Sequence, residues 1–353
     1  MIIAAFRRVV NQMPGSPRLP GGVESTDYTR ALCYTLSVSY HIAIDLGGTQ
    51  MRAGLFPAGS LHPERLERIP THSPGEMPLT RLLDLIAGIL PGEAQVQAIG
   101  VAAPGPLDPF TGTIFTAVNV QGFTNLPLRQ IIEDRFGIPV AVGNDANLAA
   151  LGEWKHGAGQ GYHNLIYMTI STGIGAGVIM DDHLLLGQRG LATELGHVTV
   201  DPNGPLCPCG QYGHLEAMAA GPAIAKWTAS QIEAGEASSL PDGQPLTAKA
   251  VADAALAGDP LAIRALERAG RLIGHALADY LHIFNPAAIV LGGGVTRSGK
   301  LILDPLRQAL HEFTLSKDYL EGLSLLTAAL GDDAGLTGAL ALARQMASEP
   351  AAR

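Results

Sequence analysis

The chain contains the pattern of strand, glycine-rich turn and strand twice, and this repetition limits the possible folds more than any other feature. The first copy runs from residue 41 to 56 around the turn Leu46-Gly-Gly-Thr49. The second runs from residue 164 to 180 around the turn Ser171-Thr-Gly-Ile-Gly175. Short apolar runs bounded by glycine are typical of buried strands joined by tight turns. The repetition predicts a duplicated α/β core with one glycine-rich turn in each half.

The rest of the chain alternates between strand and helix signals, as α/β proteins do. Apolar runs predict further buried strands at 98–103, 138–142 and 288–291. Helical periodicity predicts helices at 79–90, 126–136, 146–154, 222–233, 247–257 and 259–284, and a last one from Gly335 onward. Because glycine weakens a helix interior, we expect the helix at 259–284 to be broken near Gly270 or Gly274.

The length of the chain, 353 residues, suits two lobes better than one small core. Residues 1–39 show neither helical nor strand periodicity, so we assign them no function. They fit a disordered extension or a start codon placed too early. We expect a small lobe at 40–143, with a C-terminal helix at about 335–353 packing back on it. A large lobe then covers residues 144–334.

Charge and hydrophobicity exclude several classes of protein. Hydrophobic residues make up 47% of the chain, and the formal net charge is -9, so a nucleic-acid-binding surface of clustered Lys and Arg is not expected. No apolar run approaches the ~18 residues that a membrane helix needs, and no secretory signal follows Arg7 and Arg8. The chain has three cysteines, of which Cys207 and Cys209 are too close for a routine disulfide. These features predict a cytoplasmic protein with a metal site.

The two glycine turns offer a way to hold phosphate groups. Asp45, Gly47, Gly48 and Thr49 combine a carboxylate at a strand end with backbone N–H groups free of side-chain bulk. A phosphate chain and its metal can approach such a turn closely, although an ordinary hairpin explains one copy equally well. The second turn contributes Thr172 and Gly173. Two facing turns of this kind predict a nucleotide clamp.

A third glycine cluster follows the apolar run at 288–291. The segment 294–301 nearly spells a phosphate-binding P-loop, but Leu301 stands where that motif needs Ser or Thr to hold magnesium, so we reject it. We expect Gly293 and Gly294 to allow a close backbone approach to adenosine. A plain strand-to-helix turn is the alternative.

Asn144 and Asp145 lie between a predicted strand and a predicted helix. Asp and Asn are preferred helix caps, so a structural role is sufficient for Asp145. The transfer of a phosphoryl group to a sugar hydroxyl also needs a carboxylate that accepts the hydroxyl proton. Asp145 suits both roles.

The densest cluster of chemically active residues lies in the loop at 197–216. His197, Cys207, Cys209 and His214 form a Cys2His2 set, which suits tetrahedral zinc. With four protein ligands the zinc would be structural. Glu194 and Glu216 would then be free to hydrogen-bond a polyol.

Together these motifs resemble the ROK family of bacterial sugar kinases and sugar-responsive repressors. The resemblance spans about residues 42–340 and rests on Asp45-Leu-Gly-Gly-Thr49, Ala103-Pro-Gly-Pro106, Asn144-Asp-Ala-Asn147, Ser171-Thr-Gly-Ile-Gly175, Glu194-Leu-Gly-His197 and the block from Cys207 to Glu216. It implies the two-lobed actin-like ATPase fold, with a duplicated βαβ core and an interlobe cleft. It also implies a homodimer or higher homo-oligomer.

The resemblance further implies roles for individual residues. Asp145 would be the catalytic base, Gly105 would lie at the wall of the sugar pocket, and the pocket would be lined by Asn119, Asn144, Asp145, Glu194, His197 and Glu216. One departure concerns the zinc loop, where His214 stands in place of the family's usual third Cys. The family's repressors carry an added DNA-binding domain, and residues 1–40 are too short and unpatterned for one.

The leading hypothesis is a glucokinase that transfers phosphate from ATP to glucose, with Mg2+ at the phosphates and structural Zn2+ in the loop. Glu194, His197 and Glu216 would face free hydroxyls around C1 to C3 and give an N-acetyl group little apolar shelter. Alternatives within the fold are kinases for fructose, mannose, allose or an N-acetylhexosamine, or an enzyme that uses polyphosphate. A sugar-sensing regulator without catalysis is the alternative of another class.

Overall fold

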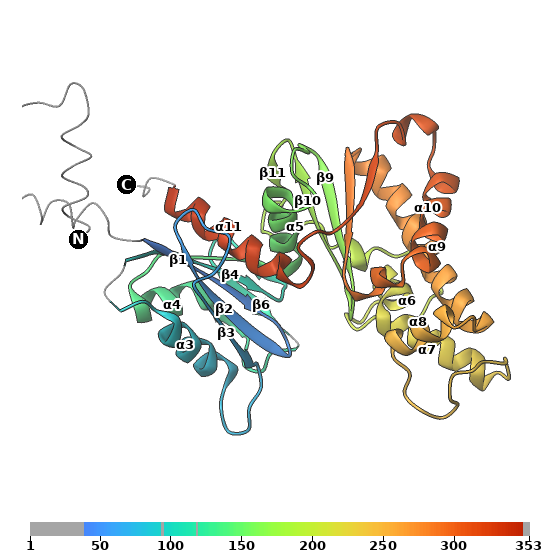
Figure 1. Cartoon of the computed structure of the whole chain (residues 1–353), viewed down its shortest axis with the longest axis horizontal. Coiled ribbons are helices and arrows are strands. Elements are labelled where there is room, and N and C mark those ends of the chain that lie inside the picture. The colour runs from blue at the N-terminus through green and yellow to red at the C-terminus, as the bar shows by residue number, and fades with distance from the viewer. Residues whose placement is uncertain (1–38, 93–94, 118, 349–353) are drawn as a thin grey trace, which may run out of the picture. The chain divides into compact units, whose positions relative to one another are not determined.

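Two five-stranded sheets with the same strand arrangement form the framework of the computed structural model (Figure 1). The structure describes residues 39–348 except 93–94 and 118. The expectation for the N-terminal extension therefore lies outside the described residues, apart from Ser39. The described residues form one compact unit.

The first sheet has the order β3-β2-β1-β4-β8, in which β2 and β3 run antiparallel and β4 and β8 run parallel to the central strand β1. The second sheet, β11-β10-β9-β12-β13, repeats this arrangement around β9. The predicted duplication is confirmed. The strands are β1 (Tyr40–Leu46), β2 (Gln50–Pro57), β3 (Arg65–Pro70), β4 (Val96–Ala103), β8 (Val140–Asn144), β9 (Leu165–Ile170), β10 (Ile174–Met180), β11 (His183–Leu184), β12 (Ala288–Gly292) and β13 (Ser324–Thr327).

Both faces of the first sheet are covered, which explains why its central strands are largely apolar. Ile42 and Ile44 of β1 point to the core that contains helices α3 (Pro78–Ile89) and α4 (Leu128–Phe136). Ala43, on the opposite face, belongs to the core with α11 (Ala334–Ser348). A small three-stranded sheet follows β4 in the chain and consists of β5 (Leu107–Asp108), β6 (Thr113–Thr116) and β7 (Thr124–Pro127).

The second sheet is covered in the same way. Ile166 and Met168 of β9 face the core that holds the long helix α9 (Pro260–Phe284), whereas Tyr167 faces α5 (Asp145–His156) and α11. The remaining helices around α9 are α6 (Leu215–Ala219), α7 (Gly221–Glu233), α8 (Ala248–Leu256) and α10 (Lys300–Phe313). Short 3-10 turns occur at Leu195–His197 (η1), Gly294–Ser298 (η2), Lys317–Tyr319 (η3) and Gly331–Asp333 (η4).

Helices α5 and α11 connect the two sheets through a shared core. This core combines Ala43 and Ala102 from the first sheet with Tyr167 and Val290 from the second. The two helices touch backbone to backbone, since a Cβ atom added at Gly338 would lie 1.7 Å from the carbonyl oxygen of Leu148. The start of α5, where Asp145 lies, is thus held from both sides.

The expected break in the long helix is wrong, because α9 runs unbroken from Pro260 to Phe284. Its glycines serve close packing instead. A Cβ atom at Gly270 would lie 2.4 Å from the carbonyl oxygen of Ile302, and one at Gly274 would lie 2.2 Å from that of Leu306, both in α10. The glycines let α9 and α10 approach each other, which offsets their weak helix propensity.

None of the helices in the described part of the chain combines the length and apolar character that a bilayer span requires.

Candidate functional site

The first glycine turn joins β1 to β2. Thr71 holds it through its hydroxyl, which donates a 2.6 Å hydrogen bond to the Gly47 carbonyl. Asp45 lies at the end of β1, and Arg52 donates to its Oδ2 atom over 2.6 Å and 3.2 Å. Arg52 is buried and also binds Asp333, the residue before α11, 2.8 Å away. Asp45 is therefore a fixed carboxylate with one oxygen engaged.

Two further predicted residues lie against glycines of the expected site. A Cβ atom at Gly48 would stand 2.9 Å from Cβ of Asn119, so the loop that carries Asn119 lies directly over the first glycine turn. A Cβ atom at Gly105 would stand 3.0 Å from Nδ2 of Asn144. The structure thus brings Asn119 to the phosphate-binding turn and Gly105 to the start of α5.

The N-terminus of α5 assigns different roles to two neighbouring residues. Asn144 is the helix cap, since its Oδ1 accepts hydrogen bonds from the N–H groups of Ala146 at 3.0 Å and Asn147 at 3.2 Å. Asp145 is the first helical residue, with Oδ1 accepting from Ala146 N–H over 2.8 Å. The capping role considered for Asp145 is wrong, because the amide of Asn144 fills it.

Asp145 is exposed to solvent, although protein atoms surround its carboxylate closely enough to desolvate it in part. Desolvation raises its pKa to about 6, and the negative charges of Asp45 and Glu194 add to the rise. The hydrogen bond from the Ala146 N–H acts in the opposite direction. The interaction shows that Asp45, Asp145 and Glu194 lie close enough for their charges to affect one another.

The second glycine turn is tied to the predicted sugar residues by Glu216. The Ile174 N–H donates a 2.9 Å hydrogen bond to its Oε2 atom, and a Cβ atom at Gly173 would lie 2.5 Å from the same oxygen. The expectation that Glu216 is free is therefore wrong for Oε2, and Oε1 lies 3.9 Å from Sγ of Cys207. Glu194 has a pKa raised by burial, which His197 partly reverses and Glu216 increases. The structure places Glu194, His197 and Glu216 in one cluster.

A cavity of about 580 Å³ begins at the second glycine turn. Thr172 and Gly294 both line it, together with Gly221 and Pro222 at the start of α7. Its other walls are largely apolar residues of α7 and α8, with Lys249 and Arg297 among the charged residues that line it. Gly293 does not line the cavity. A Cβ atom there would lie 2.3 Å from the carbonyl oxygen of Ile170. The size and lining suit a nucleoside.

The predicted metal ligands converge. Ligand atoms of His197, Cys207, Cys209 and His214 all lie within 4.8 Å of one another. Sγ of Cys209 is 3.2 Å from Nδ1 of His214, and Sγ of Cys207 is 3.6 Å from Nδ1 of His197. In a tetrahedral zinc site a sulfur and a nitrogen ligand lie about 3.5 Å apart, so the donor set fits this metal.

Comparisons with known proteins agree with this geometry. A sequence profile described as the ROK family matches residues 41–346. The chain belongs to the ROK family. A glucokinase of Streptomyces coelicolor is 34% identical over 312 residues, which are 86% of this chain and 97% of that protein. A solved structure of a ROK family glucokinase from Streptomyces griseus, in complex with glucose and AMPPNP, has a TM-score of 0.73 at 35% identity and covers 87% of this chain and 99% of its own.

The ROK family also contains regulators similar to this chain. The xylose repressor of Bacillus spizizenii is 30% identical over 315 residues, which are 87% of this chain but 77% of the repressor. The kinases are thus matched over nearly their full length. Together with the sheet topology, the ROK membership confirms the predicted actin-like ATPase fold.

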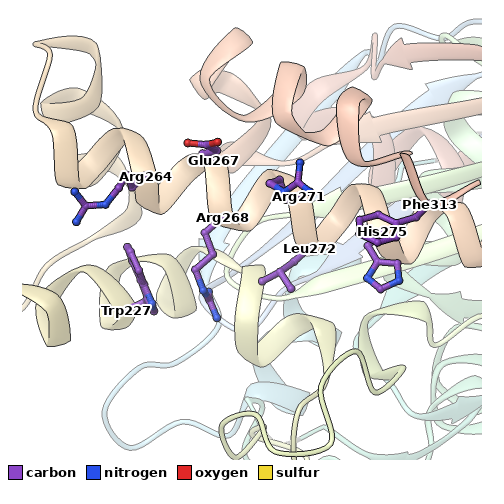
Figure 2. Close-up of a pocket in the computed structure, with 8 residues that line it drawn as sticks. All are labelled: Trp227, Arg264, Glu267, Arg268, Arg271, Leu272, His275 and Phe313. Atoms are coloured by element: carbon purple, nitrogen blue, oxygen red, sulfur yellow. The ribbon is translucent and has the colours of Figure 1, made fainter. Parts of the chain in front are cut away.

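A second pocket of this ROK protein, of about 480 Å³, lies on α7, α9 and α10 (Figure 2). Figure 2 shows Arg268 extending beside Trp227, and its guanidinium lies 5.4 Å from the centre of that ring. The charges here are balanced, because Arg264 pairs with Glu236 and Arg271 with Glu312, and Glu267 also lines the pocket. None of the predicted site residues lines it, so we place neither substrate there.

Sequence reasoning missed residues that support the ROK site. Arg52 in β2 and Thr71 just after β3 hold the first turn and Asp45, and no local sequence pattern predicts these contacts. Asn147 and Thr193 hydrogen-bond to each other over 3.1 Å, and neither was among the predicted site residues. The available signal is a polar residue, Asn147, between the apolar residues Ala146 and Leu148 in the first turns of the helix.

Proposed function

We propose that this ROK protein is an ATP-dependent hexokinase that phosphorylates the C6 hydroxyl of glucose, with Asp145 as general base. The observation that carries the proposal is the Asp145 carboxylate. It lies at the start of α5, close to Glu194 and Asp45, and its pKa is raised to about 6. Such a group is ionised at neutral pH and is a better proton acceptor than an ordinary aspartate. The match to glucokinases over nearly their whole length supports the same reaction.

The polar residues around Asp145 would bind the sugar. Asn119, Asn144, Glu194, His197 and Glu216 would hydrogen-bond the hydroxyls, with Gly105 at the wall. Fixing the sugar in this way orients the C6 hydroxyl toward Asp145, which accepts its proton as the oxygen attacks. Oriented carboxylates and amides discriminate strongly, since a poor substrate leaves buried polar groups unpaired. This arrangement favours glucose over N-acetylglucosamine.

ATP would occupy the cavity at the second glycine turn, with adenosine near Gly294 and the phosphates between the two turns. Thr172, Gly173, Gly48 and Thr49 would contribute backbone and hydroxyl groups there. Gly47 would shape the turn instead, because its N–H donates to the Gln50 carbonyl and its carbonyl accepts from Thr71. Asp45 fits a role at the metal, because both contacts from Arg52 use Oδ2 and leave Oδ1. When bound, Mg2+ would balance charge on the phosphoryl group in transfer.

The Cys and His cluster would hold one structural zinc ion. His197 turns Nδ1 toward Cys207, so its Nε2 is left for a sugar hydroxyl. His214 immediately precedes α6, the helix that carries Glu216. Zinc would therefore hold two sugar-binding side chains from one loop. We further propose that the enzyme works in the cytoplasm, where ATP is available, and that it is a homo-oligomer, as the family resemblance implies.

The test is a measurement of kcat/KM for glucose, mannose, fructose and N-acetylglucosamine with Mg-ATP, repeated with polyphosphate as donor. The expected result is the highest value with glucose and ATP. A preference for another sugar or donor contradicts only the assignment of glucose or of ATP and leaves the proposed kinase activity standing. Sugar binding without any turnover, in protein shown to be folded, contradicts the kinase and supports a regulator.

A further inference from the structure

Thr193 has a backbone conformation that β-branched residues rarely adopt. Its φ angle is 69°, and the other non-glycine residues of positive φ in the described ranges are all Asn or Asp. A β-branched side chain in this region is an outlier that the surroundings must stabilise, at a cost of about 1–3 kcal/mol. Thr193 immediately precedes Glu194, the predicted sugar ligand. The strain therefore lies next to the reaction site.

The hydroxyl of Thr193 joins this strained turn to the helix of the base. Its single O–H is shared between Oδ1 of Asn147, 3.1 Å away, and the Ala192 carbonyl, 2.6 Å away. Asn147 is 3% exposed and stands two residues after Asp145 in α5. Its Oδ1 also packs on β10, where a Cβ atom at Gly177 would lie 3.1 Å away. The amide has little room to move.

The same turn is anchored at its other end. The hydroxyl of Tyr280, in α9, donates a 2.5 Å hydrogen bond to the Leu195 carbonyl. Within the turn, the Leu195 N–H donates to the Thr193 carbonyl over 2.7 Å. Glu194 therefore sits between a contact to α5 and a contact to α9. Only the α5 contact ties it to the element that carries Asp145.

We propose that Thr193 and Asn147 are positioning residues that set Glu194 relative to Asp145, an inference that rests on the proposed kinase function. Glu194 holds a hydroxyl of the sugar ring, and Asp145 receives the proton from another hydroxyl of the same sugar. A shift of the turn by ~1 Å would misplace the reacting oxygen and lower the rate by about 100-fold. The Thr193 hydroxyl prevents this shift.

The test compares Thr193→Val, Thr193→Ala and Thr193→Ser with the wild type, using the sugar that the wild type prefers. Valine keeps the shape and loses the hydroxyl, alanine also removes the branch at Cβ, and serine keeps the hydroxyl without that branch. We expect kcat to fall about 10- to 100-fold in the valine and alanine variants with KM for ATP unchanged, and to stay within about threefold of wild type in the serine variant.

Thr314→Val is the matched control, because the Thr314 hydroxyl also bonds a backbone carbonyl, that of Leu310, far along the chain from the site. It should change the unfolding temperature alone. Asn147→Ala should lower kcat as Thr193→Ala does, and the double variant should be no slower than the slower single one.

Several outcomes overturn the inference. Wild-type kcat in Thr193→Ala, or a serine variant as slow as the valine variant, contradicts the role of the hydroxyl. Multiplicative losses in the double variant contradict the pairing with Asn147. If the wild type itself phosphorylates none of the hexoses, the proposed function fails instead, and the two failures are distinguished by that single measurement.

Discussion

Replacing Asp145 by asparagine should abolish transfer and at the same time stabilise the protein at alkaline pH. Desolvation raises the pKa of this carboxyl from 3.8 to about 6, so the folded state holds the proton more tightly than the unfolded state does. The ionised carboxylate therefore destabilises the fold. This cost is absent below the unfolded pKa and grows as pH rises through the folded one.

The magnitude follows from the two pKa values. A rise from 3.8 to about 6 corresponds to a ceiling of about 3 kcal/mol, at about 1.4 kcal/mol per pH unit. Because the carboxylate is open to water on one side, screening reduces the expected gain in Asp145→Asn to about 1 kcal/mol. For a chain of this size that is about 2 °C in unfolding temperature at pH 8, with little gain near pH 4.

The assay pairs calorimetry at pH 4 and pH 8 with kcat/KM for glucose. Asp145→Asn should lose at least about 100-fold in kcat/KM while it still binds glucose, because the amide cannot accept a proton. In the wild type, kcat/KM should rise with pH through about 6 and then level. Asp279→Asn, at an exposed position of α9, is the control. More than about a tenth of wild-type kcat/KM, or equal changes in unfolding temperature at both pH values, would refute this reasoning.

Three further changes test other parts of the molecule. Metal analysis should find about one zinc per chain, and Cys209→Ser should lower both zinc content and glucose affinity; folded, active protein without zinc would contradict the site. Glu153→Gln should lower the free energy of unfolding by about 2–4 kcal/mol in denaturant titrations, because this buried carboxylate accepts three backbone N–H groups. Gly274→Ala should cost about 1–3 kcal/mol, whereas Gly88→Ala, with open space around its Cβ, should be neutral or stabilising; equal effects would contradict the close packing of α9 on α10.

The duplicated core could be predicted because both halves carry the same local pattern. Buried central strands such as β1 and β9 are apolar on both faces and end at glycine-containing turns, so they stand out in the sequence. Edge strands do not stand out in the sequence in this way. β3 reads Arg-Leu-Glu-Arg-Ile-Pro and is largely exposed, and it becomes a strand only because β2 offers it a hydrogen-bonding edge.

The long helix shows where local reasoning fails. Gly270 and Gly274 predict a weak point when α9 is considered alone, yet they are positions where the backbone of α10 comes very close. The helix propensity lost at two glycines is about 2 kcal/mol, and the burial of apolar side chains between α9 and α10 outweighs this loss. Since α10 itself was not predicted, the sequence held no visible reason for the glycines.

The candidate site was predictable where a motif holds the chemistry and not where tertiary contacts change it. The four Cys and His residues converge as their spacing suggested, because the ligands of one loop need little help from the fold. Glu216 was expected to be free, but its Oε2 accepts the Ile174 N–H from a turn 42 residues earlier in the chain. Such a contact depends on how β10 and α6 pack, which no local pattern encodes.

The first turn of α5 explains why the base can be both rigid and reactive. Asn144 caps the helix by accepting from the N–H groups of Ala146 and Asn147, and Asn147 also holds the strained turn before Glu194, so Asp145 shares only the Ala146 N–H. A carboxylate at a helix start is usually stabilised in its charged form by the helix dipole and by capping, which lowers its pKa. Here the cap belongs to the neighbour, and desolvation with Asp45 and Glu194 nearby raises the pKa instead. Exchanging Asn144 and Asp145 would place the carboxylate at the cap position and keep the composition. The pKa of this carboxyl should then be low, and phosphoryl transfer should be lost.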